Sequence, residues 1–251
     1  MYKFDVELNS KQIEELARTD PKAWFTGVEF ANARSPVHPE AAWLEENNSY
    51  KQAMVETWIR QLVPGRRVID TFCANGVFSF LAAQEGAKSV TGVDFEPIRI
   101  DAGNLVVRLL ADSGHPIDAD FRVADVYRLG ETVTGTFDVV LCLGGLYHVP
   151  DPAHVLSQLH KVTGEWLIVQ TSRVLPLPGN WARFTARPVT VNQPEKGLSS
   201  VRAGTGVWHY TPECIRQLLH HSGFEIIEER RSPWSRRRRY PWYAALARAQ
   251  R

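Results

Sequence analysis

The most informative part of this sequence is the run Arg67-Val68-Ile69-Asp70-Thr71-Phe72-Cys73-Ala74-Asn75-Gly76, together with the later run Val90-Thr91-Gly92-Val93-Asp94. The first run predicts an apolar strand that ends in an acid, followed by a tight turn of small residues and a helix. The second run predicts another strand that ends in an acid. In an open α/β sheet, such runs place a ligand across the carboxyl ends of both strands, with the second acid beside a ribose.

The size and composition of the chain fit one large α/β domain. It has 251 residues, of which 44% are hydrophobic, and its net charge of +1 gives no bias toward nucleic acid or membrane. The sequence shows neither a membrane-spanning stretch nor the apolar core of a signal peptide. Three widely spaced cysteines predict no disulfide framework, so we expect a reduced, cytoplasmic protein: Cys73, Cys142 and Cys214.

Strand and helix patterns alternate from residue 67 onward. Strands are expected over residues 67–71, 89–94, 121–124, 137–143, 166–170, 224–230 and 242–248. Helices are expected over residues 77–85, 97–110, 152–161 and 212–222. This alternation predicts a doubly wound α/β fold with a seven-stranded, mostly parallel sheet and an antiparallel edge.

The remaining segments suggest how the chain is organised. Residues 1–63 are expected to form an N-terminal helical cap, with a capping box from Asn9 to Gln12 and a longer helix from about Ser49. Residues 64–251 are expected to form the ligand-binding domain, in one compact unit with the cap. An irregular segment from about 173 to 208, rich in Pro, Gly and Trp, is expected to be a lid.

The turn after the first strand separates three kinds of ligand site. A dinucleotide site needs G-x-G-x-x-G, but Phe72, Ala74 and Gly76 stand here, which weakens the case for a nicotinamide-dependent oxidoreductase. A P-loop would need Gly-Lys-Ser/Thr after the strand. S-adenosylmethionine has no phosphates and needs less room. Its carboxylate can bind at the helix start near Gly76. Its ribose hydroxyls can donate to Asp94, and its adenine amine can donate to Asp125.

Several segments occur in a recognisable order. They are Val68-Ile69-Asp70 with Cys73-Ala74-Asn75-Gly76, then Gly92-Val93-Asp94, Val123-Ala124-Asp125-Val126, Phe137–Pro152, and Tyr210-Thr211-Pro212-Glu213 with Ser222-Gly223-Phe224. The chain resembles class I S-adenosylmethionine-dependent methyltransferases over roughly residues 50 to 250, although Phe72 and Ala74 replace the usual glycines. The resemblance implies a Rossmann-like fold and S-adenosylmethionine as cofactor. It implies cofactor contacts from Asp70, Phe72, Ala74, Asn75, Gly76, Asp94, Phe95, Asp125, Val126 and Leu143.

Within that superfamily, Leu146-Tyr147-His148 resembles the wobble-uridine carboxymethyltransferases of tRNA, as do Trp24–Val28 and Ser49-Tyr50-Lys51. Those enzymes hold a carboxylated cofactor with a lysine, a tyrosine and an arginine. Lys51 and Tyr147 match the first two, but Tyr243 stands where the arginine is expected. An added carboxylate would lose its bidentate partner, which favours plain methyl transfer.

Methyl transfer from a sulfonium mainly needs alignment of nucleophile, methyl and sulfur, and such positioning can supply ~7–11 kcal/mol. Tyr147 and His148 follow the fourth strand. We expect His148 to act as general base and Tyr147 to orient the acceptor. The alternatives are a structural histidine for His148, a strand-end cap for Asp94 and a turn-starting acid for Asp125. The acceptor is expected to contact Trp24, Tyr50, Lys51, Trp181, Phe184 and Trp208, unless these side chains only pack.

One arginine-rich run is the only concentrated charge in the sequence. It contains Arg230, Arg231, Arg236, Arg237, Arg238 and Arg239. These side chains could bind tRNA phosphates, or could form a solvated connection between edge strands. The sequence has no cluster of His, Asp or Glu with metal-ligand spacing, so no metal is expected.

The sequence therefore predicts a methyltransferase that moves a methyl group to O or N of a small aromatic or heterocyclic acceptor. One alternative is a tRNA-modifying enzyme that uses the same or a carboxylated cofactor. Another is a non-catalytic binding protein that keeps the fold. The identity of the acceptor and the oligomeric state are not encoded in any of these motifs.

Overall fold

The computed structural model describes residues 2–39, 41–171, 174–175, 177–186, 206–232 and 241–250, without the side chains of 41–48 and 186. These residues group into two compact units. The first contains the residues up to Ala53 together with Ile59–Val123. The second contains Met54–Trp58 and the described residues after Val123. We describe each unit by itself.

The predicted seven-stranded, mostly parallel sheet with an antiparallel edge is confirmed. Its strands are β3 (Arg67–Thr71), β4 (Ser89–Asp94), β5 (Ala119–Val123), β6 (Phe137–Leu143), β7 (Thr163–Thr171), β10 (Phe224–Arg231) and β11 (Tyr243–Ala249), in the order β10-β11-β7-β6-β3-β4-β5. In the first unit, β4 runs parallel to both β3 and β5. In the second unit, β6 and β7 are parallel, whereas β11 runs antiparallel to β7 and β10.

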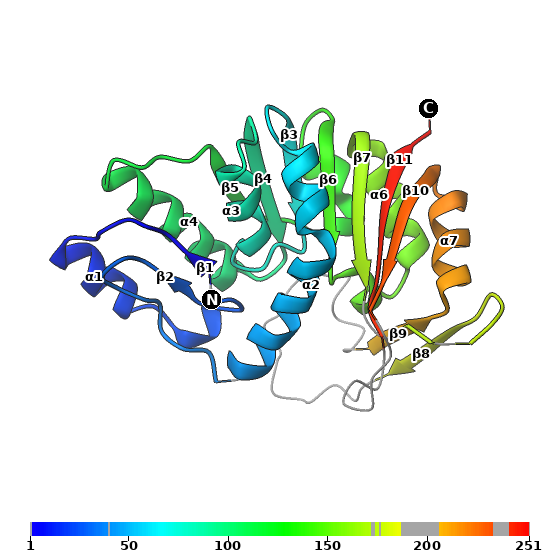
Figure 1. Ribbon diagram of the computed structural model, residues 1–251, viewed down its shortest axis with the longest axis horizontal. Coiled ribbons are helices and arrows are strands. Elements are labelled where there is room, and N and C mark those ends of the chain that lie inside the picture. The colour runs from blue at the N-terminus through cyan, green and yellow to red at the C-terminus, as the bar shows by residue number, and fades with distance from the viewer. Residues whose placement is uncertain are drawn as a thin grey trace. The chain divides into compact units, whose positions relative to one another are not determined.

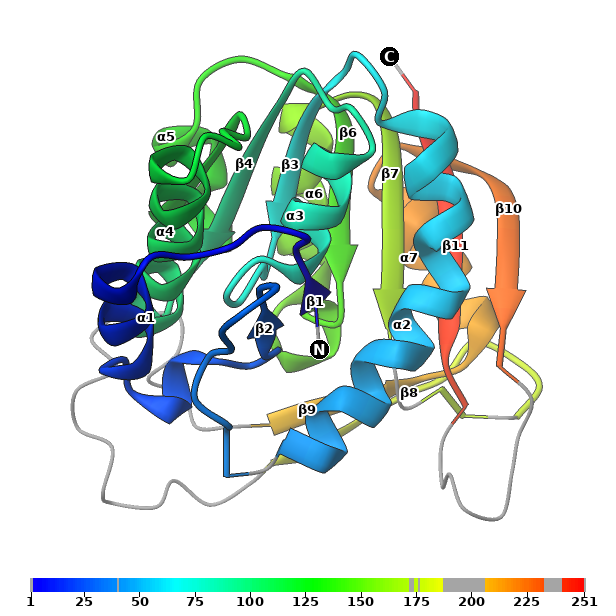
Figure 2. The same ribbon diagram turned by 60° about the vertical axis from the view of Figure 1, so that its left-hand side comes forward.

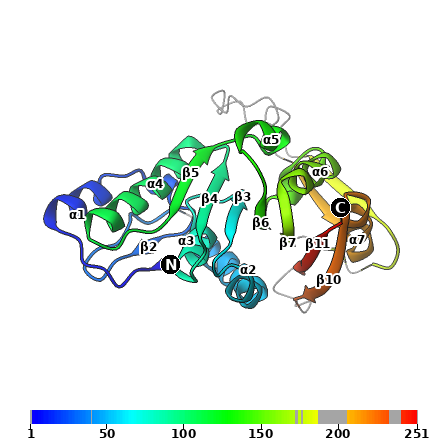
Figure 3. The same ribbon diagram turned by 90° about the horizontal axis from the view of Figure 1, so that it is seen from above.

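The first unit places three helices and two short strands around β3–β5. They are β1 (Tyr2–Lys3), α1 (Ser10–Ala17), β2 (Val28–Glu29), α3 (Val77–Gln84) and α4 (Pro97–Asp112), with a 3-10 turn η1 (Pro21–Ala23) (Figure 1). The predicted capping box is present at Asn9, whose side chain accepts from the N–H of Gln12. Seen from above, α1 lies beside α4 (Figure 3). There Gln12 Nε2 donates to the Leu109 carbonyl at 3.3 Å.

Helix α2 (Ala41–Leu62) begins well before the expected start near Ser49. The expectation followed apolar spacing, but good helix formers such as Ala41 and Glu45 extend a helix without adding to an apolar stripe. Residues 54–58 of α2 group with the second unit. Trp58 connects this part of α2 to the second unit, because its indole N–H donates to Glu228 of β10. The expected division of the chain at residue 63 stays a prediction.

Two helices of the second unit cover one face of its strands (Figure 2). Helices α6 (Pro152–Val162) and α7 (Pro212–His221) lie behind β6, β7, β11 and β10 in Figure 2. Three short helical turns complete the unit: η2 (Val126–Arg128), α5 (Leu129–Thr132) and η3 (Leu146–His148). Strand β7 is longer at both ends than the expected span of 166–170.

Part of the expected irregular lid is regular. Strands β8 (Ala182–Ala186) and β9 (Gly206–Tyr210) form an antiparallel pair. The pair is held by side-chain contacts across strands, because the ring of Phe184 lies 5.0 Å from that of Trp208. A Cβ at Gly206 would collide with the Phe184 ring, so the ring can take this position only because residue 206 has no side chain. Residues 187–205 of the lid lie outside the described residues.

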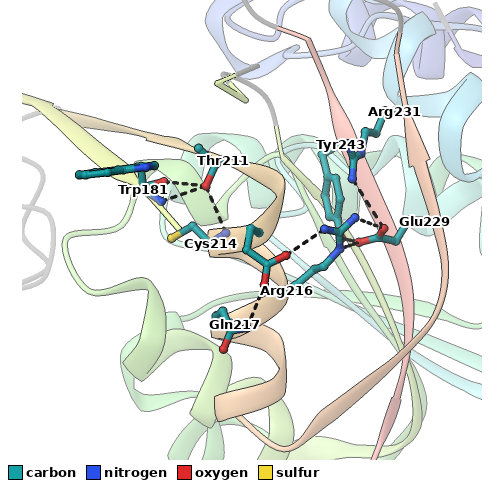
Figure 4. A network of polar contacts seen from close by, with 9 residues as sticks. Trp181, Thr211, Cys214, Arg216, Gln217, Glu229, Arg231 and Tyr243 are labelled. Carbon is teal, nitrogen blue, oxygen red and sulfur yellow. Dashed lines mark hydrogen bonds and ion pairs between the residues drawn. The ribbon is translucent and has the colours of Figure 1, made fainter. Parts of the chain in front are cut away.

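A polar network joins α7 to the edge of the sheet in the second unit (Figure 4). Arg216 donates to both carboxylate oxygens of Glu229, at 2.8 and 2.7 Å, and also pairs with Glu213. The buried hydroxyl of Tyr243 donates to the same Glu229. Burial acts to raise the pKa of Glu229, but the hydrogen bonds from Arg216 and Tyr243 hold it below its ordinary value.

Within the described part of the chain, no helix combines the length and the apolar character needed to cross a membrane.

Candidate active site

The turn after β3 has an unusual backbone. Phe72 and Ala74 adopt positive φ angles of 61° and 50°, and Gly76 follows with φ of 95°. The left-handed region is costly for residues with a Cβ, about 1–2 kcal/mol each, and is tolerated where the surrounding structure imposes it. The turn thus has a conformation that suits glycine, even though Phe72 and Ala74 occupy two of its positions.

The ring of Phe121 in β5 packs against the turn. The Phe121 ring fills the place that a Cβ would take at Gly76 and at Gly92 of β4. It also lies within about 3 Å of the Cβ position at Gly103 of α4. Three glycines from three elements therefore pack against one ring, which fixes the distance between the turn and the end of β4.

Asp94 at the end of β4 is tied to this turn. One carboxylate oxygen accepts from the N–H of Ala74 at 2.9 Å, and the other accepts from the N–H of Glu96 at 3.0 Å. Asp94 is buried, and burial raises its pKa although both backbone hydrogen bonds oppose the rise. Each carboxylate oxygen has two acceptor positions, and these two contacts use one on each oxygen.

Asp70 and Lys51 form a buried pair of ionisable groups in the same unit. Asp70 accepts from the Ser79 hydroxyl at 2.7 Å, and burial raises its pKa to about 7. Burial likewise lowers the pKa of Lys51 to about 8, while the charge of Asp70 opposes that change. Both groups therefore change protonation close to neutral pH, which makes this pair sensitive to any charge that binds beside it.

Two cationic side chains flank Phe25. The Lys51 ammonium lies 5.4 Å and the Arg99 guanidinium 5.0 Å from the centre of its ring. The neighbouring residue Thr26 is held to the turn by Asn75, which accepts from the Thr26 N–H at 2.9 Å and donates to its carbonyl at 2.8 Å. The amide of Asn75 thus serves to attach the cap segment to the turn.

Trp24 packs within the cap. It is fully buried, and its indole N–H donates to the Thr19 hydroxyl at 2.8 Å. Its expected contact with the acceptor stays a prediction. Tyr50 is exposed and Phe95 is half-buried, and both belong to the first unit.

The second unit contains the other expected cofactor residues. Asp125 is half-buried and caps η2, because its side chain accepts from the N–H of Tyr127 at 3.0 Å. That contact matches the alternative of a turn-starting acid. Val126 and Leu143 are buried, with Leu143 at the end of β6.

The turn η3 presents Tyr147 and His148, whose ring centres are 4.1 Å apart. Tyr147 is half-buried and His148 is exposed. Strand β9 holds the carbonyls on either side of this pair. Tyr210 donates its hydroxyl to the Leu146 carbonyl at 3.2 Å, and Trp208 donates its indole N–H to the Val149 carbonyl at 3.0 Å. The lid strand therefore fixes the position of the expected catalytic residues.

The aromatic residues expected in the lid differ in exposure. Trp181 is 65% exposed and Phe184 is 44% exposed, whereas Trp208 is partly buried. The main chain of Trp181 is bonded on both sides to Thr211, the N-cap of α7 (Figure 4). Phe184 and Trp208 thus form an aromatic pair close to η3, and Trp181 stands on the surface.

The two described arginines of the basic run make internal contacts. Arg230 stacks on Trp58 at 4.0 Å, donates to the Met54 carbonyl at 2.9 Å and pairs with Glu228. Arg231 lies 3.9 Å from Glu229. The other four members, Arg236, Arg237, Arg238 and Arg239, lie outside the described residues. The contacts of Arg230 show that this side chain joins α2 to β10.

Three residues around these groups are not predicted by any of the motifs: Phe25, Arg99 and Gln170. Phe25 and Arg99 carry no motif, and only the tertiary structure brings them to Lys51. Gln170 could have been found, since it is a polar residue at the end of an apolar strand. Among the described residues, no group of three His, Cys, Asp or Glu side chains comes together as a metal site.

Comparisons with known proteins agree with this geometry. A family profile described as a methyltransferase domain matches residues 30–229. A ubiquinone biosynthesis O-methyltransferase of Pseudomonas aeruginosa is 37% identical over 107 residues, which are 42% of this chain and 44% of the relative. The corresponding protein of Paracidovorax citrulli is 34% identical over 184 residues, 72% of this chain and 66% of the relative. The match thus spans less than half the length of the Pseudomonas relative.

A solved structure of another protein has a similar fold. The crystal structure of the N-terminal domain of EvdMO1 with SAH bound superposes with a TM-score of 0.64 at 20% sequence identity. The superposition covers 96% of this chain and 95% of that one. Neither the relatives nor this structure bear the name of a tRNA-modifying enzyme.

Proposed function

The chain belongs to the methyltransferase domain family, and from this premise we propose that it methylates an oxygen of a small aromatic acceptor with S-adenosylmethionine as donor. The observation that carries the proposal is the bond between the left-handed turn and Asp94. This bond holds a buried carboxylate beside a main-chain turn. A nucleoside without phosphates can bind there, because its ribose hydroxyls can donate to the carboxylate.

The residues present suit the cofactor. Asp94 would hold the ribose hydroxyls. The contact of Asp125 with the adenine amine stays a prediction. Lys51, Arg99 and the start of α3 supply positive charge for a carboxylate, and Asp70 supplies negative charge for an ammonium group. When bound, the sulfonium supplies an activated methyl group.

The protein's own contribution to the chemistry is to position the acceptor and to move one proton. His148 would take the proton from the acceptor hydroxyl as the new bond to carbon forms, and Tyr147 would orient that hydroxyl. The residues on either side of this pair are held in place, because Tyr210 donates to the Leu146 carbonyl and Trp208 to the Val149 carbonyl. An oxygen acceptor is supported by the names of the relatives, and an aromatic one by the Phe184–Trp208 pair.

Calorimetry with S-adenosylhomocysteine tests the proposal. The wild-type protein should bind it, and Asp94→Asn should weaken binding roughly 10- to 100-fold because a charged acceptor of hydrogen bonds is lost. Asp112→Asn, at the exposed end of α4, is the matched control and should bind normally. A circular dichroism spectrum confirms that each variant is folded. Absence of binding by the wild type at millimolar ligand would exclude the proposed function.

A further inference from the structure

Gln170 of β7 has an unexplained side chain. It is fully buried, and among the described residues neither Nε2 nor Oε1 has a hydrogen-bond partner. A buried amide without partners loses its hydration and gains nothing in return. Native proteins leave few such groups unpaired, and a bound polar group is one way in which such an amide is satisfied.

The strand register shows which face of the sheet Gln170 occupies. Gln170 pairs with Leu143 of β6 and with Ala244 of β11, and Ala244 pairs in turn with Arg230 of β10. Paired residues of neighbouring strands point to the same face. Arg230 reaches the main chain of Met54 in α2, so Gln170 points to the face that α2 covers. Ala244 presents only a methyl group beside it.

The main chain of Gln170 also supports the expected catalytic turn. Its carbonyl accepts from the N–H of Gly144 at 2.9 Å, just before η3 begins. The unpaired amide therefore stands at the end of β7 next to the strand that leads to Tyr147 and His148. Gln170 and η3 thus lie at the ends of two neighbouring strands in the second unit.

We propose that the Gln170 side chain recognises the methyl acceptor, by accepting one hydrogen bond from it and donating another to it. The inference rests on the proposed function. An amide offers an acceptor and a donor side by side. Its complement is an acceptor molecule with two neighbouring polar atoms, such as a second hydroxyl next to the one that is methylated. A site with a buried amide discriminates strongly against an analogue that leaves the amide unpaired.

The test compares catechol, which has neighbouring hydroxyls, with phenol, which has one. Methyl transfer from radiolabelled S-adenosylmethionine is measured for the wild type, Gln170→Met and Gln158→Met. Gln158 is the matched control, since it is a largely buried glutamine whose amide has a partner in His154. S-adenosylhomocysteine binding is measured for all three proteins.

The wild type should prefer catechol at least about tenfold in kcat/KM, and Gln170→Met should remove that preference through a higher KM for catechol. Gln170→Met should also raise the unfolding temperature, because it deletes an unpaired polar group, and should leave S-adenosylhomocysteine affinity unchanged. Gln158→Met should keep the preference and lower the unfolding temperature.

The proposal is overturned if Gln170→Met keeps the catechol preference. It is also overturned if the wild type binds S-adenosylhomocysteine but methylates phenol as well as catechol, or neither. Failure of the wild type to bind S-adenosylhomocysteine at all is a different result, because it excludes the proposed function itself.

Discussion

The ring of Phe121 occupies the space that a side chain at Gly92 would need. Gly92 lies in β4 two residues before Asp94, and the same ring contacts Gly76 at the start of α3. The position of the candidate cofactor site therefore depends on a packing contact that involves none of its polar atoms.

Gly92→Ala should destabilise the protein by about 1–3 kcal/mol, because the added methyl group overpacks the Phe121 ring. In a Phe121→Leu background the same substitution should cost less, with a coupling of about 0.5–3 kcal/mol. Urea unfolding of the four proteins measures both quantities. Gly130→Ala is the control, since a Cβ there meets open space. Additive costs would contradict the packing contact.

Ala74→Gly should stabilise the protein by about 1 kcal/mol, because glycine adopts a positive φ without the clash of a Cβ. The expected rise in Tm is about 2–4 °C for a chain of this size. Ala83→Gly, in the last turn of α3, is the matched control and should not raise stability, because a residue with a helical φ gains nothing from the freedom of glycine. A loss of stability in Ala74→Gly would show that the turn is not strained at this residue.

The stability of the protein should depend on Asp70 between about pH 4 and pH 7. The folded-state pKa is raised to about 7, whereas an unfolded aspartate titrates near ~3.9. In this window the folded protein holds a proton that the unfolded chain has released, so stability falls as pH rises. The unfolding free energy of Asp70→Asn minus that of the wild type should therefore increase through the window and level off above it.

Ser79→Ala provides the control for this pH dependence. The hydrogen bond from Ser79 acts to lower the pKa of Asp70, so its loss should move the upper end of the window to higher pH. Guanidinium unfolding curves at several pH values measure the change. A difference between Asp70→Asn and the wild type that is constant with pH would contradict the raised pKa.

Tyr210→Phe should reduce kcat several-fold without changing S-adenosylhomocysteine affinity, because η3 loses the hydroxyl that holds the Leu146 carbonyl. Stability should fall by about 1 kcal/mol. Tyr243→Phe is the matched control: it also removes a buried hydroxyl, which donates to Glu229 at the sheet edge, and it should destabilise without affecting kcat. Equal kcat values for both variants would argue against a positioning role for Tyr210.

The predictions that succeeded rest on local patterns. The strands over Arg67–Thr71 and Phe137–Leu143 are apolar runs bounded by turn residues, and the capping box at Asn9 depends on residues three positions apart. Such signals are complete within a few neighbouring residues. The roles expected for Asp94, Tyr147 and His148 stay predictions, because they concern a bound ligand.

The predictions that failed concern long-range contacts. The β8–β9 pair joins two strands that lie far apart in a segment of irregular composition. Long-range packing also brings Asp70 close to Lys51 and leaves the Gln170 amide without a partner among the described residues. Residue order defines where strands, turns and helices form, since these depend on neighbours. Burial, pKa and unmet hydrogen bonds arise only when distant segments pack together, because each depends on which atoms replace water around a side chain.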